Sequence, residues 1–289
     1  MAEKTRTHKL CEKHPLIATA LGLILPAIFI SLSSLAKTVS DDAAYIAMII
    51  ASIITLILFK AWFSPEFKGF LKAETSAKTV CLLLVPYLVF VALNVLSYLF
   101  FQGKIEFNPS VRAVTMGLAA GFNEETMFRI CALSIAARFL RKENRALITT
   151  IVLAVLFGLS HAANVQSGAN PAMTVVQVVT SIFIGLFLAA LYLRSGSIVL
   201  PIFAHAFYDW VCFVTDPTLS DNGIVVGTYS TREVIYAVVI TVLLGAAGIY
   251  LLRKPKLSET NELWYRKWSY VPSAEPAMTE GNDFTSDMK

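Results

Sequence analysis

Six ionisable side chains stand inside stretches of the sequence that are otherwise apolar. Carboxylates and imidazoles placed in this way can act as general acids and bases, relay protons through a membrane, or bind a metal ion. Two of the chain's four histidines fall in such stretches, and both others lie near the N-terminus. The candidate set is Glu124, Glu125, Arg129, His161, His205 and Asp209.

The first three of these residues interrupt an apolar run over 111–137, which is long enough to cross a bilayer. A charged residue at the centre of a membrane helix costs about 2.5–3.5 kcal/mol on insertion scales. Such groups usually serve a function and pair with groups on neighbouring helices. We therefore expect the partners of Glu124 and Glu125 on other spans.

The spacing within each run predicts local pairs. Glu125 and Arg129 are four residues apart, so they share one helix face and can neutralise each other. His205 and Asp209 have the same spacing, which allows the carboxylate to orient the imidazole or to share a ligand with it. A single buried histidine usually packs in the core and forms a hydrogen bond there. Six ionisable residues on three helices instead favour one shared site.

The composition indicates a polytopic membrane protein. The chain is 56% hydrophobic and 15% charged, with a mean hydropathy of +0.65. Its net charge of +4 is spread over short loops, which argues against nucleic acid as a partner. The four cysteines have no metal-ligand spacing. We predict an all-α fold of about eight transmembrane helices, with the site between helices 4, 5 and 7. The predicted spans are 15–36, 43–63, 79–101, 111–137, 146–165, 174–193, 197–214 and 233–252.

Basic residues alternate between successive loops in the manner that sets membrane orientation. The N-terminal segment, the loops near 60–78 and 138–145, Arg194 and the tail after 252 are basic, whereas 37–42, 102–109, 164–173 and 215–231 are not. An even number of spans with both termini in the cytoplasm satisfies this pattern. The protein is thus expected to be integral to a membrane, more readily a bacterial plasma membrane than an endoplasmic reticulum.

The expected organisation has five parts. They are a basic cytoplasmic N-terminus (1–14), N-terminal transmembrane helices (15–109), a core that holds the candidate site (110–214), the last loop and span (215–255), and a polar cytoplasmic tail (256–289). Leu263, Trp264 and Trp268 in the tail could form an interfacial anchor, with disorder as the alternative. Gly117 and Gly121 predict that another helix packs closely beside the glutamates.

The ordered set Glu124-Glu125-x-x-x-Arg129, Phe157-x-x-x-His161 and His205-x-x-x-Asp209 resembles the signature of the CAAX protease and bacteriocin-processing (CPBP, or Abi) family, which includes the Ras-converting CAAX prenyl endopeptidase. The resemblance covers about 110–214. It implies an eight-helix intramembrane endopeptidase acting on a peptide or protein at the lipid membrane, such as a prenylated tail or a bacteriocin-type precursor. Glu124 would correspond to the catalytic glutamate, with Glu125, His161, His205 and Asp209 completing the site. Asp209 departs from the asparagine that the family often has there.

Amide hydrolysis requires an activated water, a group that stabilises the oxyanion, and a proton for the leaving amine. Glu124 is the candidate base, His161 could position the water or deliver the proton, and His205 could hydrogen-bond the oxyanion. Ser160 adjoins His161 on a helix, where neighbouring side chains point apart, which disfavours a serine nucleophile.

Two questions stay open at this stage. Glu124, His161, His205 and Asp209 could hold a divalent metal such as zinc, although they lack the HExxH spacing, so metal-free and metal-assisted hydrolysis are both retained. Other classes of function are a proton-coupled transporter and a catalytically silent immunity or scaffold protein. The chain shows no inverted repeat, which disfavours the transporter.

Overall fold

The computed structural model describes residues 11, 13–63, 71–139 and 143–267, and these residues contain helices but no named strand. The elements follow the apolar runs of the sequence and are separated by short turns. They are α2 (Pro15–Ser31), η1 (Leu32–Thr38), α3 (Asp41–Phe63), α4 (Ala77–Gln102), α5 (Val111–Glu125), η2 (Thr126–Leu133), α6 (Ser134–Phe139), α7 (Glu143–Ser160), η3 (His161–Ser167), α8 (Pro171–Ser195), α9 (Val199–Thr215), α10 (Thr231–Leu251) and α11 (Lys254–Lys267).

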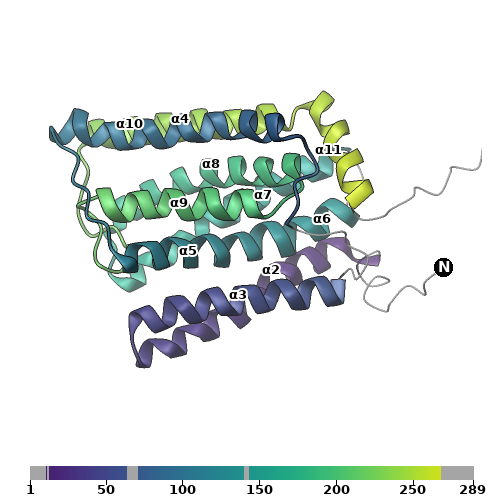
Figure 1. Ribbon diagram of the computed structural model, residues 1–289, viewed down its shortest axis with the longest axis horizontal. Coiled ribbons are helices and arrows are strands. Elements are labelled where there is room, and N and C mark those ends of the chain that lie inside the picture. Colours follow the sequence, from purple (N-terminus) through teal and green to yellow (C-terminus); the bar gives the residue numbers. More distant parts are fainter. Residues whose placement is uncertain (1–10, 12, 64–70, 140–142, 268–289) are drawn as a thin grey trace, which may run out of the picture.

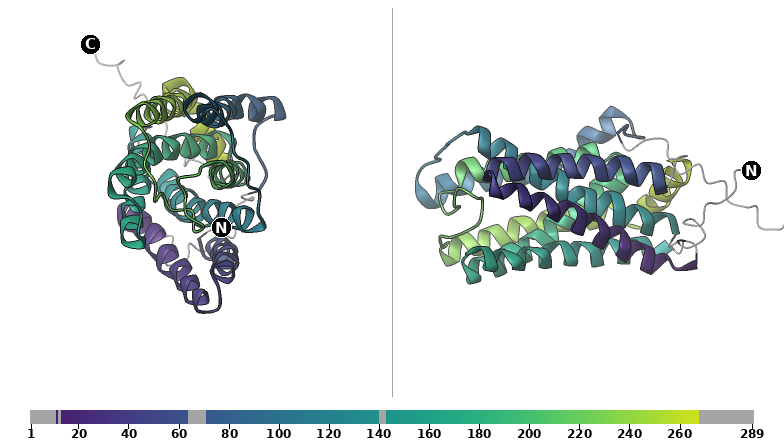
Figure 2. Two further views of the ribbon diagram at one scale, coloured as in Figure 1. Left: turned by 90° about the vertical axis from the view of Figure 1, so that its left-hand side faces the viewer. Right: turned by 90° about the horizontal axis from the view of Figure 1, so that it is seen from below.

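The long helices lie side by side with roughly aligned axes, as a membrane bundle requires (Figure 1). Helices α2 and α3 form one side of the bundle and α4 and α10 the other, with α5, α7, α8 and α9 between them (Figures 1 and 2). The closest helix pairs are α5 with α9, α8 with α10, and α7 with α8. The central helices therefore position the candidate site.

The membrane-spanning character predicted from the sequence is confirmed. Six helical segments in the described part of the chain are long and apolar enough to cross a bilayer: Pro15–Thr38, Asp41–Ala61, Ala77–Gln102, Leu147–Ser167, Pro171–Ser195 and Thr231–Leu251. Helix α9 is apolar but shorter. The predicted span 111–137 is not one regular helix, because it divides into α5, η2 and α6. Many leucine, isoleucine and valine side chains on the outer helices are exposed, as lipid-facing residues are.

A tight turn joins α8 to α9 at the end of the bundle that carries α11. Gly196 follows α8 with φ of 69°, a left-handed conformation in which glycine lacks the steric penalty of other residues. The N–H of Gly196 donates to the carbonyl of Tyr192 and ends the helix. The two helices are consequently antiparallel neighbours, as the short connection in the sequence implies.

Helix α5 packs directly on the backbone of α9 through two glycines, which confirms the close approach predicted for Gly117 and Gly121. A Cβ atom at Gly117 would lie 2.7 Å from the carbonyl oxygen of Ala206. At Gly121 it would lie 2.7 Å from the carbonyl oxygen of Ile202 and 2.9 Å from the Ala206 nitrogen. Small residues allow such contacts between membrane helices. This contact brings the carboxylates of α5 beside the imidazole of α9.

We expect Gly121→Ala to destabilise the protein by about 1–3 kcal/mol, because the new Cβ must push α9 away from α5. The melting temperature of the purified protein in detergent measures the effect. Val114→Leu, on an exposed position of the same helix, is the matched control and should change the melting temperature little. An unchanged melting temperature for Gly121→Ala would contradict the tight α5–α9 contact.

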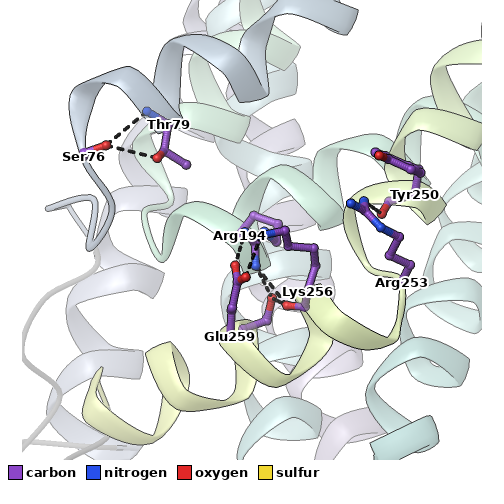
Figure 3. Close-up of polar contacts among 8 residues, drawn as sticks. Ser76, Thr79, Arg194, Tyr250, Arg253, Lys256 and Glu259 are labelled. Atoms are coloured by element: carbon purple, nitrogen blue, oxygen red, sulfur yellow. Dashed lines mark hydrogen bonds and ion pairs between the residues drawn. The ribbon is translucent and has the colours of Figure 1, made fainter.

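Helix α11 packs across the end of α8 through the buried Arg194 (Figure 3). Nη2 of Arg194 lies 2.9 Å from Oε2 of Glu259, and Nη1 donates to the Lys256 carbonyl at 2.9 Å. The hydrogen bond to Lys256, followed by the ion pair to Arg194, lowers the pKa of Glu259 from its usual value.

Trp264 is buried against Tyr192 and donates Nε1–H to the Leu193 carbonyl at 2.9 Å. The tail tryptophan therefore packs inward rather than serving as an anchor in lipid, and Trp268 lies outside the described residues.

Arg194→Gln should release α11 from the bundle without unfolding the other helices. The Glu259 contribution to docking is present above its unfolded pKa and is lost as the pH falls through the lowered folded pKa, so acidification through this range should also release α11. Hydrogen exchange of the amides in 254–267 measures both effects. Glu262→Gln, an exposed change on the same helix, is the control, and equal exchange in the two variants would refute the role of Arg194.

Candidate active site

The two glutamates end α5, and a π-helical segment follows them at once. Ser110 caps the start of α5 by accepting a hydrogen bond from the N–H of Ala113 at 3.0 Å. In η2 the N–H of Ser134 donates to the carbonyl of Arg129, five residues back, as in a π-helix. Such segments are rare and frequently occur at functional sites. Here the change of helix type begins directly after Glu125 and places Arg129 in the core.

The pair predicted between Glu125 and Arg129 is present and fully enclosed. Nη1 of Arg129 lies 3.0 Å from Oε1 of Glu125, with 2% and 0% of the two side chains exposed. Nη2 donates to the carbonyl of Gly185 on α8 at 3.0 Å, and the guanidinium stacks 4.5 Å from the ring centre of Phe157. A buried ion pair is tolerated only when further polar contacts support it. These contacts fix Glu125 in position.

His205 on α9 bridges all three carboxylates of the site. Its Nδ1 lies 2.9 Å from Oε1 of Glu125, so this nitrogen carries the hydrogen that the carboxylate accepts. Its Nε2 lies 3.6 Å from Oε2 of Glu124 and 3.6 Å from Oδ2 of Asp209. The sequence predicted that Asp209 faces this imidazole, but it did not predict that Glu125 orients the ring.

His161 and His205 are separated by the ring of Phe157. Nδ1 of His161 donates to the Phe157 carbonyl at 2.9 Å, which leaves Nε2 for other partners. The Phe157 ring centre lies 5.2 Å from that of His161 and 5.7 Å from that of His205, edge-on in both cases. Phe157 is 2% exposed, so it closes the site from the α7 side. His161 stands at the point where α7 passes into the 3-10 segment η3.

Glu124, His161, His205 and Asp209 all line one cavity of about 470 Å³. Oε2 of Glu124 is buried and makes no hydrogen bond to any residue that the structure describes. The cavity is also lined by polar residues from α4, α8 and the 216–230 segment, which no motif of the sequence indicates. The signal that could have revealed some of them is an amide within an apolar run. Examples are Asn94 on α4 and Gln177 on α8, which bonds to Asn164 at 3.0 Å.

The carboxylates and imidazoles of the site are groups that can bind a divalent metal ion, but their arrangement does not suit one. Within the described ranges, no three histidine, cysteine, aspartate or glutamate side chains are arranged to hold one ion. No step below passes through a metal.

The bundle and its enclosed set of carboxylates and imidazoles define a polytopic membrane protein with a buried polar site of the kind that supports acid–base chemistry. Residues 106–211 match the family model for type II CAAX prenyl endopeptidases of the Rce1-like kind. Residues 106–211 of the 289-residue chain are thus similar to the CPBP, or CAAX protease, family, in agreement with the motif resemblance. No curated protein and no solved structure matches it. The matched region contains His161, His205, Asp209 and the glutamates.

Proposed function

We propose that the protein is an intramembrane endopeptidase in which Glu124 activates a water molecule to cleave a peptide bond of a membrane-associated or lipidated polypeptide. The observation that carries the proposal is the meeting of Glu124 with His205 and Asp209, from two helices, at the wall of one cavity. The match of residues 106–211 to this family model supports hydrolysis of peptides in general. The water-activating role of Glu124 and the nature of the substrate are our inference.

In the proposed reaction, the carboxylate of Glu124 takes a proton from water as the hydroxyl adds to the carbonyl carbon of the substrate. The charged form of His205 donates Nδ1–H to Glu125 and presents Nε2–H to the developing oxyanion. The carbon–nitrogen bond then breaks, and the proton on Glu124 passes to the leaving amine. His161 borders the same cavity and positions the water or relays this proton. Arg129 acts through Glu125 and is a positioning residue.

Purified protein reconstituted in liposomes and offered labelled peptides tests the function. Cleavage into two fragments supports the endopeptidase. Uptake of peptide driven by a pH gradient, without cleavage, would instead indicate a proton-coupled carrier, and tight binding alone would indicate a silent scaffold. Each outcome gives a different readout in the same preparation.

We expect cleavage to persist after treatment with EDTA or 1,10-phenanthroline, since the described donors form no three-ligand group. Elemental analysis of the active protein accompanies the assay. Loss of activity with chelator and its recovery on adding Zn²⁺ would overturn the metal-free form of the mechanism. A chelator has no effect on a carboxylate base that works without an ion, so the two forms are separated.

A further inference from the structure

The catalytic cavity extends toward one end of the bundle only. Its deep wall is formed by Glu124, His205 and Phe157. Its outer wall comes from the first turns of α8 and α10 and from the loop between α9 and α10, including Met173, Leu219 and Tyr229 among others. All of these outer elements lie at the end of the bundle opposite α6 and α11 (Figure 1). The substrate path therefore leads to that end.

The other end is closed beneath the site. From Ile130 to Ala136 the side chains of η2 and α6 are buried, with exposures of 0% or 1%. The facing part of α8, from Leu186 to Ser197 beyond its end, is buried as well. Arg129 and Phe157 fill the space between these layers. Among the described residues, the end that carries α6 and α11 thus offers no comparable path to Glu124.

The distribution of basic residues identifies the two membrane faces. The end that carries α6 and α11 holds Lys13, Lys60, Lys72, Lys78, Arg194, Arg253 and Lys256. The opposite end holds fewer basic residues in the described part of the chain, namely Lys37, Lys104, Arg112 and Arg232. An excess of lysine and arginine marks the cytoplasmic side of a membrane protein. The end where the cavity opens is accordingly the outer face.

The lining of the cavity is negatively charged. Four carboxylates line it, those of Glu124, Asp209, Asp216 and Glu233, against the one imidazolium of His205, and none of its described lining residues is lysine or arginine. A cleft lined by one sign of charge concentrates ligands of the opposite sign. The chemistry of the cavity favours a peptide with positive charge near the cleaved bond.

The loop 216–230 is a folded structure at the mouth of this cavity. Oδ2 of Asp216 accepts a hydrogen bond from the Tyr229 hydroxyl at 2.5 Å, and Oδ1 accepts one from Thr218 N–H at 2.9 Å. Burial, and next the charge of Asp216, raise the pKa of Tyr229, which keeps its hydroxyl a donor. The Val225 carbonyl accepts from the N–H of Asn170 at the start of α8. The loop is thereby tied to the helices that frame the opening.

Together, the geometry points to a substrate that reaches the site from the outer face of the membrane: an exported peptide, or an extracytoplasmic segment of a membrane protein, with basic residues beside the cleaved bond. This inference rests on the proposed endopeptidase function. It places the substrate on the side where a protein tail modified in the cytoplasm is absent. The Rce1-like family match alone does not specify this side.

The orientation is tested without any assay of activity. In a background where Cys81 and Cys212 are replaced by serine, Asp221→Cys marks the loop at the cavity mouth and Ser258→Cys marks α11; both positions are exposed. A membrane-impermeant maleimide added to intact cells should label Asp221→Cys and should spare Ser258→Cys until the membrane is permeabilised. Labelling of Ser258→Cys alone in intact cells would overturn the inference.

The side of substrate access is tested with sealed membrane vesicles and an internally quenched peptide pool that carries lysine. Right-side-out vesicles should cleave the added pool, and inverted vesicles should do so only after detergent is added. Cleavage restricted to inverted vesicles would overturn the inference while leaving the endopeptidase function intact. Failure in detergent as well would count against the proposed function, and the labelling result would still decide the orientation of the cavity.

The charge preference is tested in detergent with two matched peptide pools that carry lysine or glutamate at the same positions. The lysine pool should be cleaved with a kcat/KM about tenfold higher or more at low salt, and the ratio should fall as salt is added. Glu233→Gln and Asp216→Asn should reduce the ratio by weakening the negative lining. Equal rates for the two pools would overturn the charge part of the inference.

Discussion

Glu124→Gln is expected to lower the rate of peptide cleavage by about 10²–10⁴-fold, the range that a general base contributes. The amide keeps the size of the side chain but cannot take a proton from water at neutral pH. The loss should appear in kcat, because the substituted group acts on the water and not on the bound peptide. Initial rates with the reconstituted protein measure it.

Two controls accompany this prediction. The melting temperature of Glu124→Gln should stay close to that of the parent protein, since this side chain is partly exposed to the cavity and its Oε2 bonds to no described residue. Glu262→Gln changes an exposed carboxylate on α11 and should retain full activity. Wild-type cleavage by a folded Glu124→Gln protein would eliminate Glu124 as the base.

Arg129→Met should destabilise the protein by about 3–5 kcal/mol, the usual effect of removing one partner of a buried ion pair. Glu125 would be left enclosed without the guanidinium, and the carbonyl of Gly185 would lose its donor. Thermal unfolding in detergent measures the loss. Activity should fall too, because a displaced Glu125 no longer fixes the His205 ring.

A double variant separates the buried charge from simple packing. Glu125→Gln combined with Arg129→Met removes both charges, so it should be less destabilised than Arg129→Met alone. Arg112→Met breaks a pair with Asp42 at the surface, where ion pairs contribute little, and should leave the melting temperature nearly unchanged. A double variant as unstable as the sum of its single changes would show that the unpaired buried charge is not the main cause of the destabilisation.

The sequence predicted much of this architecture because membrane insertion imposes strong rules on composition. Apolar runs of sufficient length located most of the spans, and helical spacing predicted the Glu125–Arg129 pair. The glycines on α5 predicted a close neighbour, which proved to be α9. These inferences depend on contacts within one helix or on the bilayer itself.

Other features depend on contacts between distant segments and have no local signature. The hydrogen bond from His205 to Glu125 joins residues 80 positions apart, so no periodicity reveals it. The same holds for the contribution of the 216–230 loop to the cavity, since its sequence resembles an ordinary polar connection. The division of the fourth span was missed because its hydrophobic pattern alone does not distinguish an α-helix from a π-helical segment.

The widened turn in η2 has a consequence for how related chains should be compared. A π-helical segment closes its hydrogen bonds over five residues, one residue more than an α-helix does. Relatives that lack the added residue would keep both glutamates in place while every later position of the helix is rotated about its axis. Alignments across this region should therefore permit a one-residue gap between Glu125 and Ser134, and deletion scanning there would reveal which position is the surplus one.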